Sequence, residues 1–373
     1  MNAPVQTRVK VLFDGTDVTE EVGSDLLSFC YSDRETDEAD TVTFTLMDPD
    51  GKWAGSWRPD GGEKVEATIY DGTVHGITGV LDCGKFTVDS LRCSGSPRVM
   101  EISATSIPLA SPIRRKKKTR AWEKTTLKAI AGVIAGENGL ELLWDVEDDP
   151  EYPDQVKQDK ASDLEFLMGL CRDAGASVKV TDGKLVVFDQ KSYEKKEPVG
   201  TLVLGASNVI SGEFSTHKAE TYRSVKVSWR SPKQKSKVTA ASYYNRDFEK
   251  VTVKPKKSGG NPAVNEYVYT DPDAPEDGQE FELKKKCSSR AEAERLAKAK
   301  LRELNARSVT GRITVVGDTL LVAGAVVGIS GFGAWDGNFI IEGAKHSVGR
   351  DGYTTSLELR RVNGRYWRDE YSG

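Results

Sequence analysis

Few side chains in this sequence combine the residue type and the spacing that catalysis or metal binding requires. The three histidines, His75, His217 and His346, are far apart, and none has a His, Cys or carboxylate neighbour at the spacing of a metal site. His346 precedes a hairpin turn in AKHSVGRDGY, where a histidine packed in the core or lying on the surface is the simpler interpretation. The histidines therefore predict no metal centre.

The motifs of common enzyme classes are also missing. The sequence has no Gly-x-Ser-x-Gly elbow and no Walker loop, and Gly331-Phe332-Gly333 leads to a strand instead of a helix. Two acidic turns, Asp48-Pro49-Asp50-Gly51 and Asp271-Pro272-Asp273, could hold Ca²⁺, but ordinary turn chemistry explains them better. Paired carboxylates for sugar hydrolysis stay an open alternative without a recognisable context. We expect no enzyme activity, no catalytic residue, no cofactor and no metal.

The cysteines predict reduced thiols. Their number is odd and no CxxC pair occurs among Cys30, Cys83, Cys93, Cys171 and Cys287. Cys83 and Cys93 could face each other across a hairpin, although a functional disulfide is the weaker alternative. No run of apolar residues is long enough to span a membrane, and the N-terminus lacks an apolar signal core, so we expect a cytosolic chain without a membrane anchor.

One stretch has a marked charge. SPIRRKKKTRAW places six cations close together, namely Arg114, Arg115, Lys116, Lys117, Lys118 and Arg120. The formal net charge of the whole chain is −4, which argues against a dedicated nucleic-acid binder. A solvated connector, a contact with a protein partner and a nucleic-acid contact remain as interpretations, and we predict that these six residues contact a partner.

Hydrophobic periodicity of two marks the outer parts of the 373-residue chain. Residues 41–46 alternate strictly and place Val42, Phe44 and Leu46 on one buried face. Further strands are expected at 65–70, 86–91 and 99–104, so that residues 1–108 form an antiparallel barrel or sandwich. Strands return in residues 199–362, at 224–229, 320–330, 337–342 and 354–360.

The middle segment, 109–198, has helical spacing instead. A first helix carries Leu127, Ile130, Ala131 and Ile134, with Thr125 or Thr126 as its N-cap. A second helix begins at the capping box 162–165 and stops at Gly175. The hairpin SVKVTDGKLVVFDQ follows, which completes a small α/β domain.

Residues 231–285 are highly polar and predict a surface insertion that needs no packed core. A third helix follows from the capping box 289–292, with a narrow apolar stripe of Ala293, Ala297, Leu301 and Leu304. Residues 363–373 are left as a C-terminal tail.

An internal repeat links the two β-segments. Gly84-Lys85-Phe86-Thr87-Val88-Asp89 matches residues 337–342, GNFIIE, and the Gly-led strand at 62–67 matches that at 324–329. Met100-Glu101-Ile102 matches Leu357-Glu358-Leu359 in the next strand. Three matches in the same order favour a duplication over coincidence.

The sequence resembles the late control protein D family, the baseplate hub proteins of contractile phage tails, which are related to the hub part of VgrG-type spikes. The resemblance is carried by the Ala/Glu-rich helix 289–305, by LVAG at 321–324, by ISGFG at 329–333 and by DGNF at 336–339. The closing GYTTSL at 352–357 also fits, as do 163–167 in the middle segment and 44–53 near the N-terminus.

This resemblance implies a mainly β, α+β fold in which two tail-tube-like antiparallel β-barrel domains flank the small α/β domain. It implies a structural hub that acts as a homotrimer, joins the hexameric tail tube to the central spike protein and contacts other baseplate proteins. The expected location is the virion tail baseplate, assembled in the bacterial host cytoplasm, with DNA or tape-measure protein passing through the lumen. The alternatives are the hub of a DNA-free injection system or bacteriocin and, from another class, a tail-associated cell-wall hydrolase or carbohydrate-binding protein.

Overall fold

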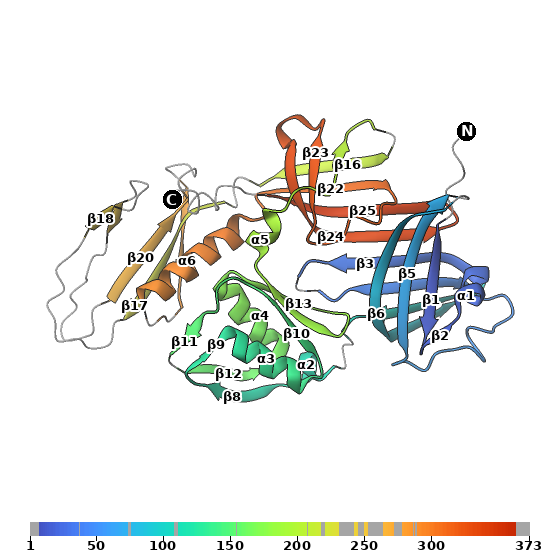
Figure 1. Ribbon diagram of the computed structural model, residues 1–373, viewed down its shortest axis with the longest axis horizontal. Helices are drawn as coiled ribbons and strands as arrows, with labels where there is room; N and C mark the ends of the chain where they lie inside the picture. The colour runs from blue at the N-terminus through green and yellow to red at the C-terminus, as the bar shows by residue number, and fades with distance from the viewer. Residues whose placement is uncertain are drawn as a thin grey trace.

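The computed structural model describes residues 7–36, 38–73, 76–107, 111–153, 155–206, 208–217, 221–230, 242–244, 250–252, 264–271, 278–285, 287 and 289–362. The predicted C-terminal tail, much of the predicted insertion and His75 lie outside this part of the chain. Two β-lobes and two smaller α/β units make up the described chain, and both small units lie toward the end at which strand β3 points (Figure 1). The predicted fold class, mainly β with α+β character, is confirmed.

The first lobe is an antiparallel sheet curled around one core. Val42, Phe44 and Leu46 are buried in it as their alternation predicts, and they pack against Val9 and Val11 from the opposite layer. Its elements are β1 (Arg8–Phe13), β2 (Thr16–Asp17), α1 (Thr19–Asp25), β3 (Leu26–Arg34), β4 (Thr41–Met47), β5 (Lys64–Thr73), β6 (Gly76–Ser94) and β7 (Val99–Thr105).

The second lobe has its own core, centred on Phe339 and Ile341. The strand expected at 320–330 is shorter than predicted, because residues 318–325 form turns that bury Leu321. Its elements are β15 (Thr201–Val203), β16 (Val209–Thr216), β22 (Val309–Val316), β23 (Val326–Ser330), the 3-10 turn η2 (Gly333–Trp335), β24 (Gly337–Gly349) and β25 (Gly352–Arg361).

The two lobes share one sheet, so the two expected barrel-like domains are joined edge to edge. Strand β24 pairs with β3, from Gly343 opposite Arg34 to Gly349 opposite Ser28. This seam joins the lobes into a 13-stranded sheet whose main path runs from β16 to β2. Neither lobe closes into a hydrogen-bonded ring among the described strands, because the edge of β3 is occupied by the second lobe.

The lobes repeat the same strand order, β3-β4-β7-β6-β5 in the first and β16-β22-β25-β24-β23 in the second. The backbone hydrogen bonds also repeat: Gly62 N–H donates to Val88 O at 2.9 Å, and Gly324 N–H donates to Ile341 O at 2.8 Å. These bonds confirm the predicted match of the two Gly-led strands.

Irregularities in the strand register occur at corresponding places. In β6 one lies between Val88 and Ser90, and in β24 one lies between Ile341 and Gly343. Two further register irregularities also correspond: one lies within residues 26–28 of β3 and the other within residues 209–211 of β16. The third sequence match, in strands β7 and β25, is displaced along the strand. Leu359 lies opposite Ile341, and Ala104 lies opposite the equivalent residue Val88, so Leu359 corresponds to Ala104.

The middle unit packs two helices on the three-stranded sheet β10-β14-β13. Thr126 caps the first of these helices and Ser162 the second, each accepting a backbone N–H, and Gly175 ends the second in a left-handed conformation, all as predicted. The elements are α2 (Pro112–Arg115), β8 (Lys118–Trp122), β9 (Thr125–Thr126), α3 (Leu127–Glu137), β10 (Glu141–Asp145), β11 (Glu151–Tyr152), β12 (Val156–Ala161), α4 (Asp163–Ala174), β13 (Ser177–Thr181), β14 (Lys184–Phe188) and α5 (Gln190–Glu194).

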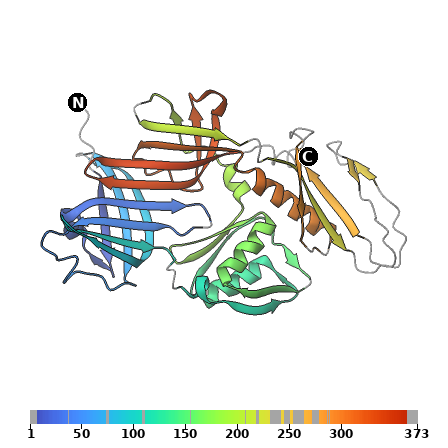
Figure 2. The same ribbon diagram turned by 180° about the vertical axis from the view of Figure 1, so that it is seen from behind.

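The outer unit is inserted between β16 and β22 and lies beside the middle unit (Figure 2). It differs from the predicted coreless insertion, because its sheet β20-β17-β21 packs Val225, Val227 and Tyr267 against helix α6. Ser289 caps α6 as predicted, and Ala293, Ala297 and Leu301 are buried. The elements are β17 (Tyr222–Arg230), β18 (Ser242–Tyr244), β19 (Lys250–Thr252), β20 (Val264–Thr270), β21 (Gln279–Leu283) and α6 (Arg290–Asn305). The domain limits drawn from the sequence stay predictions.

Candidate functional site

The six cations of the basic run have two different environments. Strand β8 alternates, so Lys118, Arg120 and Trp122 share one face, and Trp122 stacks on Phe166 at 6.4 Å between ring centroids. Lys118 and Arg120 both bind the fully buried carboxylate of Asp163, at 2.5 and 3.0 Å. These two residues therefore belong to the interior of the middle unit.

Further contacts complete this cluster. Arg120 donates to Gln158 Oε1 at 2.8 Å and to Glu137, and its guanidinium lies 4.3 Å from the ring centroid of Trp122. Burial raises the pKa of the Asp163 carboxyl, but hydrogen bonds from Gln158, Lys118 and Asn138 outweigh this effect, and the pKa lies below its ordinary value of 3.8. Asp163 is an N-terminal residue of α4, where a negative charge is also stabilised.

The other four cations belong to the one-turn helix α2 and the residues that follow it. Ile113 is buried and fixes this turn, and Arg114 Nη1 donates to the carbonyl of Ile107 at 3.3 Å. Arg115, Lys116 and Lys117 are exposed. The structure therefore leaves a smaller exposed group, Arg115-Lys116-Lys117, which we name the basic turn.

The seam between the lobes contains a buried histidine. The His346 ring stacks on Tyr31 of the facing strand, and its Nδ1 hydrogen-bonds the Tyr353 hydroxyl at 2.8 Å. Burial lowers the pKa of His346 to about 4, so the imidazole is neutral at neutral pH. The sequence interpretation of His346 as a core residue is confirmed.

Buried ion pairs fix the lobes against the small units. Lys179 of β13 binds Asp33 at 2.7 Å and Asp40 at 3.0 Å, both from the first lobe. Asp33 also accepts the backbone N–H of Ala323 from the second lobe, at 2.8 Å. One carboxylate of the first lobe thus contacts both the middle unit and the second lobe.

A second buried cluster centres on Arg360 of β25. Its guanidinium contacts Glu35 at 3.4 Å and Glu342 at 3.2 Å, and it also binds Glu194 of α5. Arg302 of α6 binds the same Glu194 at 2.8 Å. This cluster joins both lobes and both small units, and it needs every partner because unpaired charges are costly when buried.

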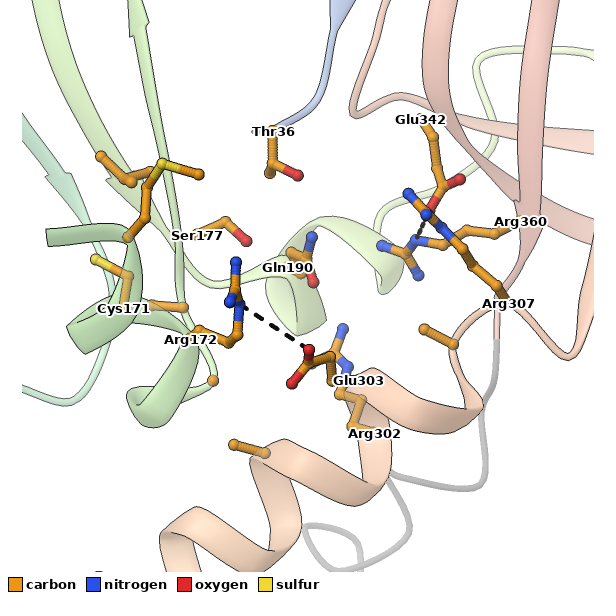
Figure 3. Close-up of a pocket in the computed structure, with 16 residues that line it drawn as sticks. Thr36, Cys171, Arg172, Ser177, Gln190, Arg302, Glu303, Arg307, Glu342 and Arg360 are labelled. Atoms are coloured by element: carbon orange, nitrogen blue, oxygen red, sulfur yellow. Dashed lines mark hydrogen bonds and ion pairs between the residues drawn. The ribbon is translucent and has the colours of Figure 1, made fainter. Parts of the chain in front are cut away.

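A cleft of about 290 Å³ opens beside this cluster, between α4, α6 and β25 (Figure 3). Arg172 points across it toward Glu303 at 4.0 Å, and Arg307 pairs with Glu342 at 3.2 Å. Burial raises the pKa of the neighbouring Cys171 thiol to about 12, so this cysteine is not a nucleophile. The side chains of the cleft pair with one another and do not form a catalytic arrangement.

The first lobe has an apolar pocket of about 330 Å³ under its 48–59 loop, lined by Trp53, Trp57 and core strands. The acidic turn that begins this loop is ordinary turn chemistry, because Asp48 accepts the backbone N–H groups of Trp53 and Ala54 at 3.0 Å. Most of the second acidic turn lies outside the described residues. Within the described chain, no group of three or more His, Cys, Asp and Glu side chains has the arrangement of a metal site.

The described cysteines are all free, with Cys83 buried and Cys93 exposed. None of the described helices has the length and apolar character needed to cross a bilayer. The site therefore consists of surfaces and seams, and a catalytic centre is not among its features.

Comparison with known proteins agrees with this arrangement. A family model described as the phage tail baseplate hub (GPD) matches residues 88–352, which is more than half of the chain. The chain belongs to the phage tail baseplate hub family. The match includes the middle unit, the basic run and most of the second lobe.

Proteins similar in sequence or in fold cover almost the whole chain. A probable baseplate hub protein of Escherichia phage 186 is 28% identical over 366 residues, covering 92% of this chain and 90% of its own. A tail protein from Neisseria meningitidis superposes with a TM-score of 0.67 at 17% identity, over 97% of this chain and 98% of its own. An E. coli component of the type VI secretion system shares the fold with a TM-score of 0.55 at 12% identity, over 97% of this chain and 78% of its own.

The hub family is structural, which fits the lack of a catalytic arrangement in the cleft. Sequence reasoning found the family and the basic run, but it missed the buried partners of Lys118 and Arg120. An alternating pattern in KTRAW was the available signal, since it places both cations on the face of Trp122.

Proposed function

We propose that the protein is a homotrimeric adaptor at the centre of a phage tail baseplate. It joins the hexameric tail tube to the central spike protein and contacts other baseplate proteins. DNA or tape-measure protein passes through its lumen, and assembly takes place in the bacterial host cytoplasm. Membership of the baseplate hub family supports the coarser part of this proposal.

The duplication of the lobes is the observation that carries the trimer. Both lobes have the same strand order, the same hydrogen bonds at Gly62 and Gly324, and register irregularities at corresponding places. One chain therefore supplies two similar lobes, and three chains supply six. Such a set matches a hexameric tube while it keeps threefold symmetry for a spike.

Both small units lie at the same end of the lobes, so the two ends of the proposed ring differ. The middle unit contacts Asp33 and Asp40 where β3 ends and β4 begins, and the outer unit is inserted at the corresponding place between β16 and β22. The opposite end carries the turns 95–98 and 350–351 and the 48–63 loop that follows β4, but neither of the small units. We assign this opposite end of the ring of six lobes to the tube and the end with the small units to the spike.

The masses of the particles in solution test this function. Light scattering of the purified chain, alone and mixed with its spike protein or tube protein, will give a trimer that binds both. A chain that stays monomeric and ignores both partners would refute the hub proposal. Cell-wall degradation by the purified chain would favour the hydrolase alternative.

The basic turn is our proposed partner contact, with an acidic baseplate protein or the lumen contents as its partner. Of the six predicted residues, Arg115, Lys116 and Lys117 provide the accessible charge. Replacing these three with Ser will weaken assembly more strongly at low salt than at high salt, because salt already screens contacts between exposed charges. Removing three exposed cations elsewhere, Arg58, Lys85 and Lys157, provides the control of equal charge. Unchanged assembly would make the basic turn a solvated connector.

A further inference from the structure

The two strand edges that pair in the seam between the lobes each have an equivalent edge in the other lobe, and these equivalent edges do not pair with each other in the described chain. In the seam, Lys345 of β24 lies opposite Ser32 of β3. The repeated registers give each of these residues an equivalent in the other lobe. Ser90 follows the irregularity in β6 as Gly343 does in β24, so Arg92 is the equivalent of Lys345.

The partner strand has its equivalent by the same reasoning. Ser32 lies opposite Thr41 in the first lobe, and Ser215 lies opposite Thr310 in the second. Thr41 lies opposite a residue of β7 that itself pairs with β6, and Thr310 lies opposite a residue of β25 that itself pairs with β24. The positions reached in this way on β6 and β24 are equivalent in the repeat, so Thr41 and Thr310 correspond. Ser215 of β16 is therefore the equivalent of Ser32.

Both equivalent edges are open in the described chain. Strand β16 has β22 as its only strand partner there, and its residues 211–213 and 215–216 are exposed, as is His217, which follows it. Past Asp89, β6 pairs with β7 alone among the described strands, and Arg92, Cys93 and Ser94 are exposed. Open strand edges of this length promote association, which a partner strand prevents by covering them.

We propose that β6 of one copy pairs with β16 of a second copy, in the register of the internal seam. Ser90 then lies opposite His217, Arg92 opposite Ser215 and Ser94 opposite Glu213 of the neighbour. This inference rests on the proposed trimer and adds the strands, the direction and the register of its contact. The two edges lie on different lobes, so the contact is head-to-tail, and in the proposed trimer it closes into a ring after three copies.

The side chains at these edges agree with the pairing. Cys93 takes the place of the buried His346, and it will be covered opposite Phe214, as His346 is covered by Tyr31 in the seam. Arg92 is a diagonal neighbour of Glu213 on the same face, which gives an opposite-charge pair across the contact. Ile210, which is 58% exposed in the single chain, lies at the start of the same edge.

Disulfide trapping tests the register. Arg92→Cys and Ser215→Cys are introduced together in a Cys93→Ser background, so that the exposed native thiol is removed. Directly opposite residues of antiparallel strands have Cα atoms about 4.5–5.5 Å apart, which a disulfide bridges. Mild oxidation of the chain with its spike protein will give a covalent species of three times the chain mass on a denaturing gel.

The matched control is Arg92→Cys with Thr216→Cys, because a shift of one residue places the second thiol on the opposite face of the sheet. Cross-linking of the control as efficiently as the test pair overturns the register. A trimer that forms without cross-linking of the test pair overturns the inference and leaves the proposed hub intact. A chain that stays monomeric with spike and tube overturns both.

Discussion

Replacing Arg120 with Ser will destabilise the middle unit, although Arg120 belongs to a run that reads as surface charge. The change removes the guanidinium from Asp163, which is fully buried, and from Gln158 Oε1. It also removes the contact with the ring of Trp122. Lys118 stays bound to Asp163 in this variant, so one cation remains for the buried carboxylate.

The expected loss is about 3 kcal/mol. A hydrogen bond to a charged group contributes about 1.5–3 kcal/mol when its partner stays buried, and Arg120 provides one to Asp163. The ion pair with Glu137, whose side chain is 39% exposed, adds at most about 1 kcal/mol. Lys118→Ser should cost less, about 2 kcal/mol, because Arg120 still binds Asp163 and keeps its contacts with Gln158 and Trp122.

Hydrogen exchange is the suitable assay, because a chain with several cores need not unfold in one step. A loss of about 3 kcal/mol corresponds to roughly hundredfold faster exchange of the amides in β12 and α4. Lys116→Ser is the control, since this exposed neighbour should change stability by no more than about 0.5 kcal/mol. The effect of Arg120→Ser should also shrink as the pH falls through the lowered pKa of Asp163, where the carboxylate is lost.

Equal exchange rates for Arg120→Ser and Lys116→Ser would refute this reasoning. The run would then be solvated throughout, and the alternating face of β8 would have no energetic meaning. Faster exchange in the lobes instead of β12 and α4 would place the role of Arg120 outside the middle unit.

Three further predictions concern the junctions. His346 should titrate near pH 4 by NMR. Because this pKa lies below the unfolded value of 6.5, the stability of the folded chain should fall by up to about 3 kcal/mol as the pH drops from 6.5 to 4. A titration midpoint above 6 would mean that the seam admits water. Arg360→Met removes the cation from two buried acids, Glu35 and Glu194, and from the partly exposed Glu342, and it should cost about 3–5 kcal/mol at neutral pH in denaturant titrations. Gly317→Ala brings a methyl group to 2.0 Å from the Tyr353 ring and should lower stability by about 1–3 kcal/mol, whereas Gly23→Ala, with nothing within 4 Å, should not.

Local features of this fold were predictable because they depend on neighbouring residues. The alternation of Val42, Phe44 and Leu46 and the caps at Ser162 and Ser289 follow from periodicity and from side-chain hydrogen bonds within one turn. The pairing of the Gly-led strands at Gly62 and Gly324 was readable as well, since the duplicated backbone requires positive φ at both glycines.

Contacts between distant segments were not predictable in the same way. Nothing in the residues around β3 specifies that its edge pairs with β24, because both lobes offer similar edges and the choice is made by the assembled fold. The outer unit was missed because its strands β20 and β21 are polar on one face and lie within a polar stretch. The packing of Tyr267 from β20 and of Phe281 and Leu283 from β21 against the core of α6 shows that these strands share a core.

The duplication also affects how this chain can change over time. In an assembly of identical single-lobe subunits, each mutation alters every lobe, so a new domain must fit at all positions at once. Here the two copies of the lobe are encoded separately. The first has only six residues, 35–40, between β3 and β4, while the second accommodates the whole outer unit at the corresponding place between Thr216 and Val309. Each lobe can therefore acquire its own contacts while the other keeps the ancestral shape.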